Sequence, residues 1–244
     1  MAVDEALLHN FRRDDLPILR LYSWEDSLTL GRFSNISKSL DLEMVEKKNI
    51  PYVRRMTGGG ILIHGGDVSY SLILDRDSLD HLGVKESYRY FCKFLIDLYK
   101  KLGIEADFAY NLRVESPKSN ICMASNEPYD IIIEGQKIGG NAQRYTREAL
   151  FQHGTIPISL DEVLFGDIFL EESGLREATA LDRIGEGIMV GELTLLVVDA
   201  FSQSFGVNII NDTLDPSEQQ SADKLLREKY SQDRWNIDAQ QDRA

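Results

Sequence analysis

The sequence predicts an α+β fold built from mixed, largely antiparallel sheets that are flanked by helices. Stretches with strand-like and helix-like apolar spacing follow one another without the regular alternation that parallel βαβ units require. The 244 residues include 43% hydrophobic and 27% charged side chains, an ordinary globular composition. We therefore expect a single domain over residues 1–235 and a flexible tail over residues 236–244.

The first half of the chain is expected to contain short helices and strands in mixed order. Helical patterns cover residues 1–10 and 39–49, and a strand follows each, over residues 17–24 and 50–56. Two further strands, over residues 61–64 and 68–74, are separated by Gly65-Gly66.

The second half begins with an amphipathic helix over residues 86–103, where apolar side chains recur at helical spacing and Gly103 ends the pattern. Residues 129–145 predict a hairpin that turns at Glu134-Gly135, with Gly139-Gly140 after its second strand. Another strand is expected over residues 148–160, and the rest of the chain is expected to be mostly helical.

The charge distribution argues against a general nucleic-acid binder and favours a small basic site. Lys and Arg number 27 against 40 Asp and Glu, a net charge of −13, whereas a nucleic-acid surface would be basic. Positive side chains nonetheless flank the glycine-rich and apolar segments in the middle of the chain: Arg54, Arg55, Lys137, Arg144 and Arg147. A basic pocket on an acidic body suits a small anionic ligand or an acidic partner protein.

Nothing in the sequence indicates a membrane or secreted protein. No apolar run approaches the roughly 18 residues of a membrane span, and the N-terminus lacks the apolar region of a secretory signal. The two cysteines, Cys92 and Cys122, make neither a disulfide framework nor a zinc motif. We expect a cytoplasmic protein with no metal site.

Three consecutive glycines, Gly58, Gly59 and Gly60, follow Arg54 and Arg55. They do not form a nucleotide P-loop, because no G-x-x-x-x-G-K-[ST] occurs and a strand, not a helix, comes next. The loop is either a flexible turn or a bare stretch of backbone whose N–H groups, with the two arginines, face a bound chain or phosphate.

His64 and His153 lie at strand ends and are each followed by glycine, and Lys137 lies in a strand between Gly135 and Gly139-Gly140. A strand histidine is more often a hydrogen-bonded structural residue than a catalyst, and a hairpin lysine is more often a solvated charge. Together with the glycine loop, however, Lys137 is better interpreted as a positive charge aimed at a carbonyl or phosphate.

The two cysteines differ in their surroundings. Cys92 falls on the apolar face of the predicted helix and is interpreted as a small core residue. Cys122 lies in a polar, irregular segment 15 residues before Lys137. It is either incidental or a nucleophile whose pKa a nearby lysine lowers from about 8.5.

Four segments together resemble one superfamily over nearly the whole chain: "MAVDEALL", "RRMTGGGILIHGGDVSYS", "GQKIGGNAQRYTREALFQHGTI" and "EKYSQDRWN". The superfamily comprises lipoate–protein ligases and lipoyl or octanoyl transferases, and it shares a catalytic fold with biotin–protein ligases. The resemblance implies that an acyl chain runs directly along the bare backbone of a tunnel and that Lys137 contacts its carbonyl end. The substrate-binding residues implied are Arg54, Arg55, Gly58, Gly59, Gly60, His64, Gly139, Gly140, Asn141 and His153.

Within the superfamily, the segment around Cys122 favours the cysteine-type octanoyltransferases. Ligases typically carry a G-R-N-D-like element before the lysine hairpin, whereas this sequence reads "CMASNEPYDIII" there. Cysteine-type transferases have a cysteine seven residues before a tyrosine–acid pair, a spacing that Cys122 and Tyr129-Asp130 match. Gly60 stands where transferases often have arginine.

The resemblance to the transferases implies a two-step acyl transfer. Cys122 would take an octanoyl or lipoyl group from acyl carrier protein as a thioester. A lysine of an apo lipoyl domain, on the glycine cleavage H protein or a 2-oxoacid dehydrogenase E2, would then accept it. Lys137 would stabilise the oxyanion, and His153 is a candidate for the base. No cofactor is required in this reaction, and neither nucleic acid nor membrane takes part.

Two alternatives remain open at this stage. An ATP-dependent lipoate–protein ligase would need ATP and Mg²⁺ and would form lipoyl-AMP before lipoyl-lysine. A catalytically inactive relative would bind acyl chains or lipoyl domains without turnover. Family members usually have a strand before the "MAVDEALL" helix, so we expect either a start farther upstream or a sheet without that edge strand.

Overall fold

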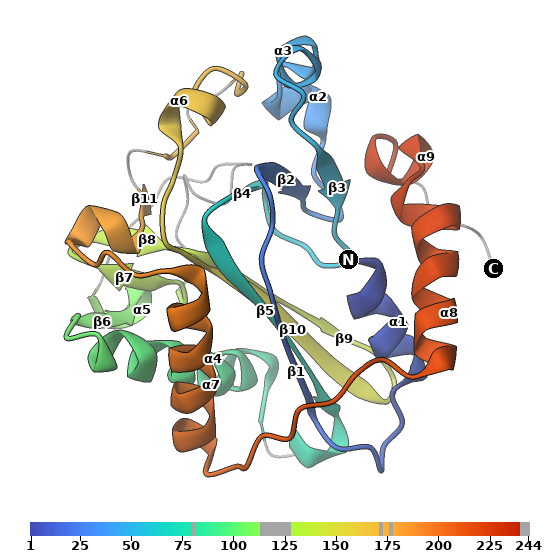
Figure 1. The fold of residues 1–244 in the computed structure, drawn as a ribbon, viewed down its shortest axis with the longest axis vertical. Coiled ribbons are helices and arrows are strands. Elements are labelled where there is room, and N and C mark those ends of the chain that lie inside the picture. The colour runs from blue at the N-terminus through green and yellow to red at the C-terminus, as the bar shows by residue number, and fades with distance from the viewer. Residues whose placement is uncertain (80–81, 113–127, 171–172, 176–177, 240–244) are drawn as a thin grey trace.

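The central element of the fold is a four-stranded antiparallel sheet (Figure 1). The computed structural model describes residues 1–79, 82–112, 128–170, 173–175 and 178–239. The sheet has the order β1-β5-β10-β9, and β5 and β10 pair along their full nine-residue lengths. Its strands are β1 (Ile18–Tyr22), β5 (Asp67–Asp75), β10 (Ala149–Pro157) and β9 (Gly140–Tyr145).

Two smaller sheets lie beside the central one. One has the order β3-β2-β4, with β3 (Tyr52–Arg54), β2 (Ser27–Leu30) and β4 (Leu62–His64). The other has the order β11-β8-β7-β6, with β11 (Ala178–Thr179), β8 (Gln136–Ile138), β7 (Ile131–Ile133) and β6 (Ala106–Phe108). Only the β2–β3 and β11–β8 pairs of the described strands are parallel, so the predicted α+β class with mixed, largely antiparallel sheets is confirmed.

Helices cover both faces of the central sheet. The helix α4 (Val84–Lys101) packs with α7 (Val190–Phe205) on one face, and α1 (Ala2–Asn10) packs with α8 (Pro216–Leu225) on the other (Figure 1). The remaining helices are short: α2 (Ile36–Ser39), α3 (Leu42–Lys47), α5 (Ala109–Leu112), α6 (Glu162–Phe165) and α9 (Asp233–Asn236). No helix in the described ranges is long and apolar enough to cross a membrane.

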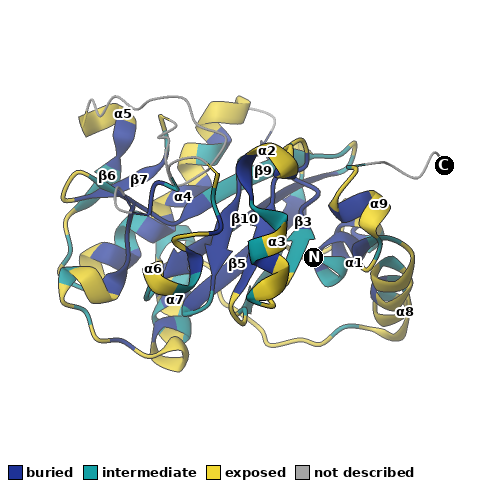
Figure 2. Cartoon of the chain, turned by 90° about the horizontal axis from the view of Figure 1, so that it is seen from above, coloured by how far each residue is buried: buried dark blue, intermediate teal, exposed yellow. Residues whose placement is uncertain are grey.

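The alternation of side chains along β5 and β10 divides the core into two layers. Tyr70 and Leu72 face α4 and α7, whereas Ile73 and Phe151 face α1. The strands are therefore buried on both faces, as the continuous dark blue of β5 and β10 in Figure 2 shows. Each fully buried aliphatic side chain contributes about 2 kcal/mol to folding, so this sheet is the stable base of the molecule.

Most of the predicted elements are present, with boundaries shifted by a few residues. The hairpin turns at Glu134-Gly135, where both residues have positive φ (50° and 81°), and α4 is followed by Gly103 at φ 76°. The sequence patterns missed β2, β6 and β11. These strands have only two to four residues, and their tertiary partners stabilise them more than their own alternation does.

The pair Gly65-Gly66 does more than separate two strands, because it moves the chain from one sheet to another. β4 pairs with β2, whereas β5 belongs to the central sheet. Both glycines have positive φ (118° and 77°), and a Cβ would lie 2.0 Å from Asp26 Oδ1 at Gly65 and 2.2 Å from Ser159 Oγ at Gly66. Only glycine fits a turn this tight.

Arg54 holds the C-terminal segment against residues 31–34. Its side chain is fully buried, with Nε 3.0 Å from Trp235 O, Nη2 2.9 Å from Asn236 O and Nη1 2.7 Å from Gly31 O. The Arg54 main-chain N–H also donates to Asn236 Oδ1. The expectation that Arg54 contacts substrate therefore needs correction, because its guanidinium donates to main-chain carbonyls. Asn236, placed in the predicted tail, is likewise buried in α9.

An Arg54→Met variant is expected to be destabilised by roughly 3 kcal/mol or more, because several buried carbonyls lose a charged donor. Urea unfolding of the purified variant would measure the loss. The exposed Arg147→Met variant is the matched control and should stay within about 0.5 kcal/mol of the parent. Equal stability of the two variants would contradict this anchoring role.

Candidate functional site

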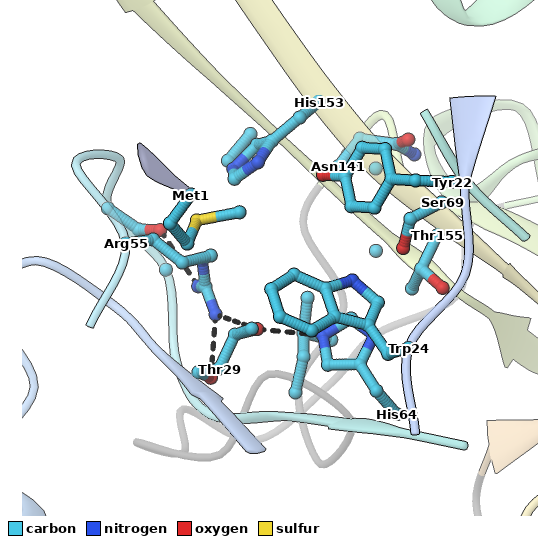
Figure 3. Close-up of a pocket in the computed structure, with 16 residues that line it drawn as sticks. Met1, Tyr22, Trp24, Thr29, Arg55, His64, Ser69, Asn141, His153 and Thr155 are labelled. Atoms are coloured by element: carbon cyan, nitrogen blue, oxygen red, sulfur yellow. Dashed lines mark hydrogen bonds between the residues drawn. The ribbon is translucent and has the colours of Figure 1, made fainter. Parts of the chain in front are cut away.

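A pocket opens between the glycine loop, β4 and the paired strands β9 and β10 (Figure 3). Its lining includes glycine backbone, at Gly58-Gly59 and at Gly140, and two aromatic side chains, Tyr22 and Trp24. The other lining residues are Met1, Thr29, Arg55, Leu62, His64, Ser69, Asn141, Ala142, His153, Gly154 and Thr155. A pocket that combines bare backbone with aromatic rings suits an apolar ligand.

The Arg55 guanidinium donates hydrogen bonds to main-chain carbonyls of the glycine loop. Its Nη2 lies 3.1 Å from Gly58 O and 2.9 Å from Gly60 O, while Nη1 lies 2.7 Å from Thr29 O. Gly59 has φ 93°, and a Cβ on the facing Gly31 would lie 1.7 Å from Gly59 O. The loop is therefore a fixed structure that a buried guanidinium ties to β2, rather than a loose turn.

His64 belongs to a buried hydrogen-bonded chain at the pocket wall. Its Nε2 lies 2.8 Å from Thr29 Oγ1 and its Nδ1 lies 3.2 Å from Asp67 Oδ2. Burial of Asp67 opposes its ionisation, but hydrogen bonds and charge from His64, with a further bond from Thr155, lower the pKa of Asp67 below its usual value. Asp67 thus stays charged and fixes the His64 ring against Trp24, whose ring centroid is 5.1 Å away.

His153 lies across the pocket from His64, where its Nε2 is 2.6 Å from Thr57 Oγ1. Burial, reinforced by the positive charge of Arg55, lowers the pKa of His153 to about 3. A neutral imidazole this weakly basic does not suit proton removal from an acceptor lysine whose pKa is about 10.4. His153 therefore fits a role as a neutral wall of the pocket and not the role of base.

His153 is expected to make the free energy of unfolding depend on pH in the acid range. Its pKa is lower in the folded state than the unfolded value of about 6.5, so the unfolded state binds the extra proton. The stability due to the neutral ring is complete above pH 6.5 and is lost as the pH falls toward 3. From pH 7 to pH 4.5 the loss should be roughly 3 kcal/mol in urea unfolding. A His153→Gln variant should lack that loss, and an unchanged loss would contradict the assignment.

Lys137 forms a buried ion pair with Asp130 beside β8. The two side chains are 3% and 5% exposed, and Lys137 Nζ lies 2.5 Å from Asp130 Oδ2. β7 and β8 position them, because Asp130 immediately precedes the hairpin and Lys137 pairs with Ile132 within it. The ion pair with Asp130 holds the Lys137 ammonium in a fixed direction.

The structure gathers most of the predicted site residues but not all of them. Seven line the pocket, namely Arg55, Gly58, Gly59, His64, Gly140, Asn141 and His153. Four others are not among its lining residues, namely Arg54, Gly60, Gly139 and Lys137. Gly139 has φ 65°, and a Cβ there would lie 2.1 Å from Thr155 O, so it permits close packing of β10. Cys122 lies outside the described residues.

Several residues at the site were not found by sequence reasoning. Tyr22 and Trp24 were interpreted only as part of a strand, and Asp67 and Asp130 were not given roles. Asp67 directly follows Gly65-Gly66, and an acidic residue after a glycine hinge is a usable signal for a buried hydrogen-bond acceptor. Trp24 carries no local signal, because only the fold brings it into the same pocket as the glycine loop.

Comparison with known proteins identifies the family. Residues 1–202 match the family described as "Lipoyl protein ligase A/B catalytic domain". The curated relatives include "Octanoyltransferase LipM" of Exiguobacterium sp., 34% identical over 96% of this chain and 92% of the relative. The relative of the same name from Bacillus subtilis is 31% identical over 97% of this chain and 92% of its own length.

Solved structures of the same fold are lipoate–protein ligases. "Lipoate-protein ligase A bound with ATP" superposes with a TM-score of 0.84 at 24% identity, covering 98% of this chain and 93% of that one. The putative lipoate protein ligase Ta0514 of T. acidophilum, solved with bound lipoic acid, also gives 0.84 at 24% identity, covering 97% and 92%. At this identity the likeness shows the fold alone. The fold is thus that of the acyl-attachment enzymes. The chain belongs to the lipoyl protein ligase A/B catalytic domain family.

Proposed function

We propose that this protein is an octanoyltransferase of protein lipoylation that works through a thioester on Cys122. The observation that carries the proposal is the pocket itself, whose lining combines the bare backbone of Gly58-Gly59 and Gly140 with the rings of Tyr22 and Trp24. A saturated chain of eight carbons has no groups to hydrogen-bond, so a narrow apolar groove along glycine backbone is a suitable way to bind it. Relatives 30–34% identical over nearly the whole chain carry the same activity in their names.

The chemistry divides acyl transfer into two substitutions. The Cys122 thiolate attacks the carbonyl carbon of an octanoyl thioester, and the carrier thiol leaves with a proton. The neutral amine of an acceptor lysine then attacks the Cys122 thioester, forms the amide and releases the free thiol. Each step passes through an oxyanion, for which the Lys137 ammonium is the proposed donor. The thioester is already activated, so neither ATP nor another cofactor takes part in these steps.

The proposed donor is octanoyl–acyl carrier protein, and the proposed acceptors are apo lipoyl domains of the glycine cleavage H protein or of 2-oxoacid dehydrogenase E2. A nucleophilic cysteine works in its reduced form, which is consistent with the cytoplasmic location expected from the sequence. We propose that the single catalytic domain expected over residues 1–235 extends to the end of α9 at Asn236. We retain Cys122, Lys137 and the pocket-lining residues as the proposed site, and Arg54 is removed from it.

The alternative is an ATP-dependent lipoate–protein ligase, supported by the fold that this chain shares with a ligase solved with ATP. Intact-protein mass after mixing the pure protein with octanoyl–acyl carrier protein, without ATP, separates the two activities. The transferase should show one octanoyl adduct, mapped to Cys122 and lost when apo lipoyl domain is added. If the apo lipoyl domain is modified only when free lipoate and ATP are supplied, the protein is a ligase and the mechanism through Cys122 is rejected.

A further inference from the structure

The mouth of the pocket lies at the glycine loop, beside the chain segment of residues 31–34. Gly59 lines the pocket and is itself exposed to solvent, so the pocket opens at this residue. The Gly31 N–H donates to Gly60 O at 3.1 Å, and Ser34 Oγ donates to Gly59 O at 3.2 Å. A Cβ on Gly31 would lie 1.7 Å from Gly59 O, so the two segments are in direct contact.

Phe33, between Gly31 and Ser34, presents its ring to solvent at this mouth. Its side chain is 85% exposed. The Arg32 guanidinium lies over the ring, with Cζ 5.6 Å from the ring centroid, and helps to hold it in place. Arg32 is itself fixed, because its main-chain N–H donates to Thr57 O at 2.7 Å and its Nη1 donates to Ala239 O at 2.8 Å. Aromatic rings of this kind are common anchors of protein interfaces.

A second exposed apolar residue lies beside Phe33. The Arg54 guanidinium donates to Ser34 O at 2.9 Å and to Ile237 O at 3.2 Å, which brings the C-terminal segment next to residues 31–34. Ile237 is 38% exposed. Single exposed apolar residues are ordinary, whereas two that lie together at the mouth of a pocket indicate a contact surface. Phe33 and Ile237 are called the mouth surface below.

The length of a lysine side chain decides which partner fits the mouth surface. In the proposed transfer, the amine of the acceptor lysine must reach an acyl group held in the pocket. Five single bonds separate the lysine Nζ from its Cα, a reach of about 6 Å. The acceptor domain must therefore touch the mouth of the pocket when its lysine enters. The donor is not limited in this way, because a carrier protein holds its thioester at the end of a long, flexible pantetheine arm.

We propose that the mouth surface docks the acceptor domain, with the Phe33 ring packed against an apolar side chain beside the acceptor lysine. The partner is a small protein domain that presents this lysine on an exposed turn. The inference rests on the proposed acyl transfer and names the surface through which the acceptor is recognised. Burial of the ring against the acceptor domain stabilises that complex, whereas the carrier binds without this contact.

The two half-reactions test the proposal separately. The acyl-enzyme is first formed from octanoyl–acyl carrier protein, and its acyl group is then transferred at increasing concentrations of apo lipoyl domain. Phe33→Ser should raise the half-saturating concentration of the lipoyl domain about tenfold or more, as expected for one anchor residue of an interface. The acylation rate and the half-saturating concentration of the carrier should stay unchanged, which also shows that the pocket is intact.

The matched control is Ile210→Ser, since Ile210 is 78% exposed in the connection between α7 and α8 (Figure 1). This control should change neither half-reaction. Phe33→Leu keeps an apolar side chain at the mouth and should retain most of the affinity for the lipoyl domain. An unchanged dependence on the lipoyl domain in Phe33→Ser, or a rise for the carrier instead, would overturn the inference and leave the proposed function intact. If the parent protein forms no acyl-enzyme from the carrier, both are overturned.

Discussion

A Cys122→Ala variant is expected to lose octanoyl transfer from acyl carrier protein by about a thousandfold or more. Without the thiolate no acyl-enzyme forms, and the acceptor amine would have to attack the carrier thioester directly. The measurement is the initial rate of lipoyl-domain octanoylation with saturating donor. Substrate binding should persist, because the pocket is lined by other residues.

The matched control for this variant is Cys92→Ala. Cys92 is fully buried in α4, and burial raises the pKa of its thiol well above the ordinary value, so it is not a nucleophile at neutral pH. Alkylation of the native protein should spare Cys92 and label it only after unfolding. Full transfer by Cys122→Ala, or lost transfer in a folded Cys92→Ala, would reject the assignment.

Lys137→Met is expected to lower the rate constant of transfer about 100- to 1000-fold, the usual cost of removing one oxyanion donor. The same change leaves the buried Asp130 carboxylate without its counter-ion. Breaking a buried pair in this way destabilises a protein by about 3–5 kcal/mol. The single variant therefore combines a catalytic and a structural loss, and its activity alone does not separate them.

The double variant Lys137→Met/Asp130→Asn separates the two effects. Neutralising both partners removes the uncompensated charge, so urea unfolding should show recovery of most of the lost stability. The rate should stay low, because the ammonium is still absent. Recovery of both stability and rate in the double variant would show that Lys137 serves the fold and has no part in the chemistry.

The fold class could be predicted because the sequence patterns of its helices and hairpins each involve only a few neighbouring residues. The helix α4 and the hairpin at Glu134-Gly135 were predictable because their spacing and turn residues are local properties of the chain. The strand β2 was not, since four residues between β1 and the glycine loop become a strand only when β3 and β4 flank them. Short strands follow tertiary pairing more closely than sequence alternation.

Parts of the site could be predicted where a residue type, such as glycine in a run, is found in only a few structural settings. Glycine runs indicated the pocket wall, whereas Lys137, predicted to aim its charge at a carbonyl or phosphate, lies in a buried pair with Asp130 and is not among the pocket-lining residues. The different contacts of Arg54 and Arg55 could not be predicted from the sequence, because neighbouring residues of an extended chain point to opposite sides. Arg55 enters the glycine loop, whereas Arg54 reaches the C-terminal segment, and the sequence places both in the same basic pair.

The contact between Arg54 and Asn236 spans 182 positions of the chain, which has a consequence for the order of events during synthesis. A ribosome would have made more than nine-tenths of the described chain before the partner of this guanidinium emerged. Until then the carbonyls of residues 235–237 do not exist to accept its protons, and of its described acceptors only the carbonyls of residues 31, 32 and 34 have been made. Closure of such long loops is slow compared with local helix formation. All strands of the central sheet are therefore complete in the chain by Pro157, well before the residues that anchor the Arg54 side chain have been made.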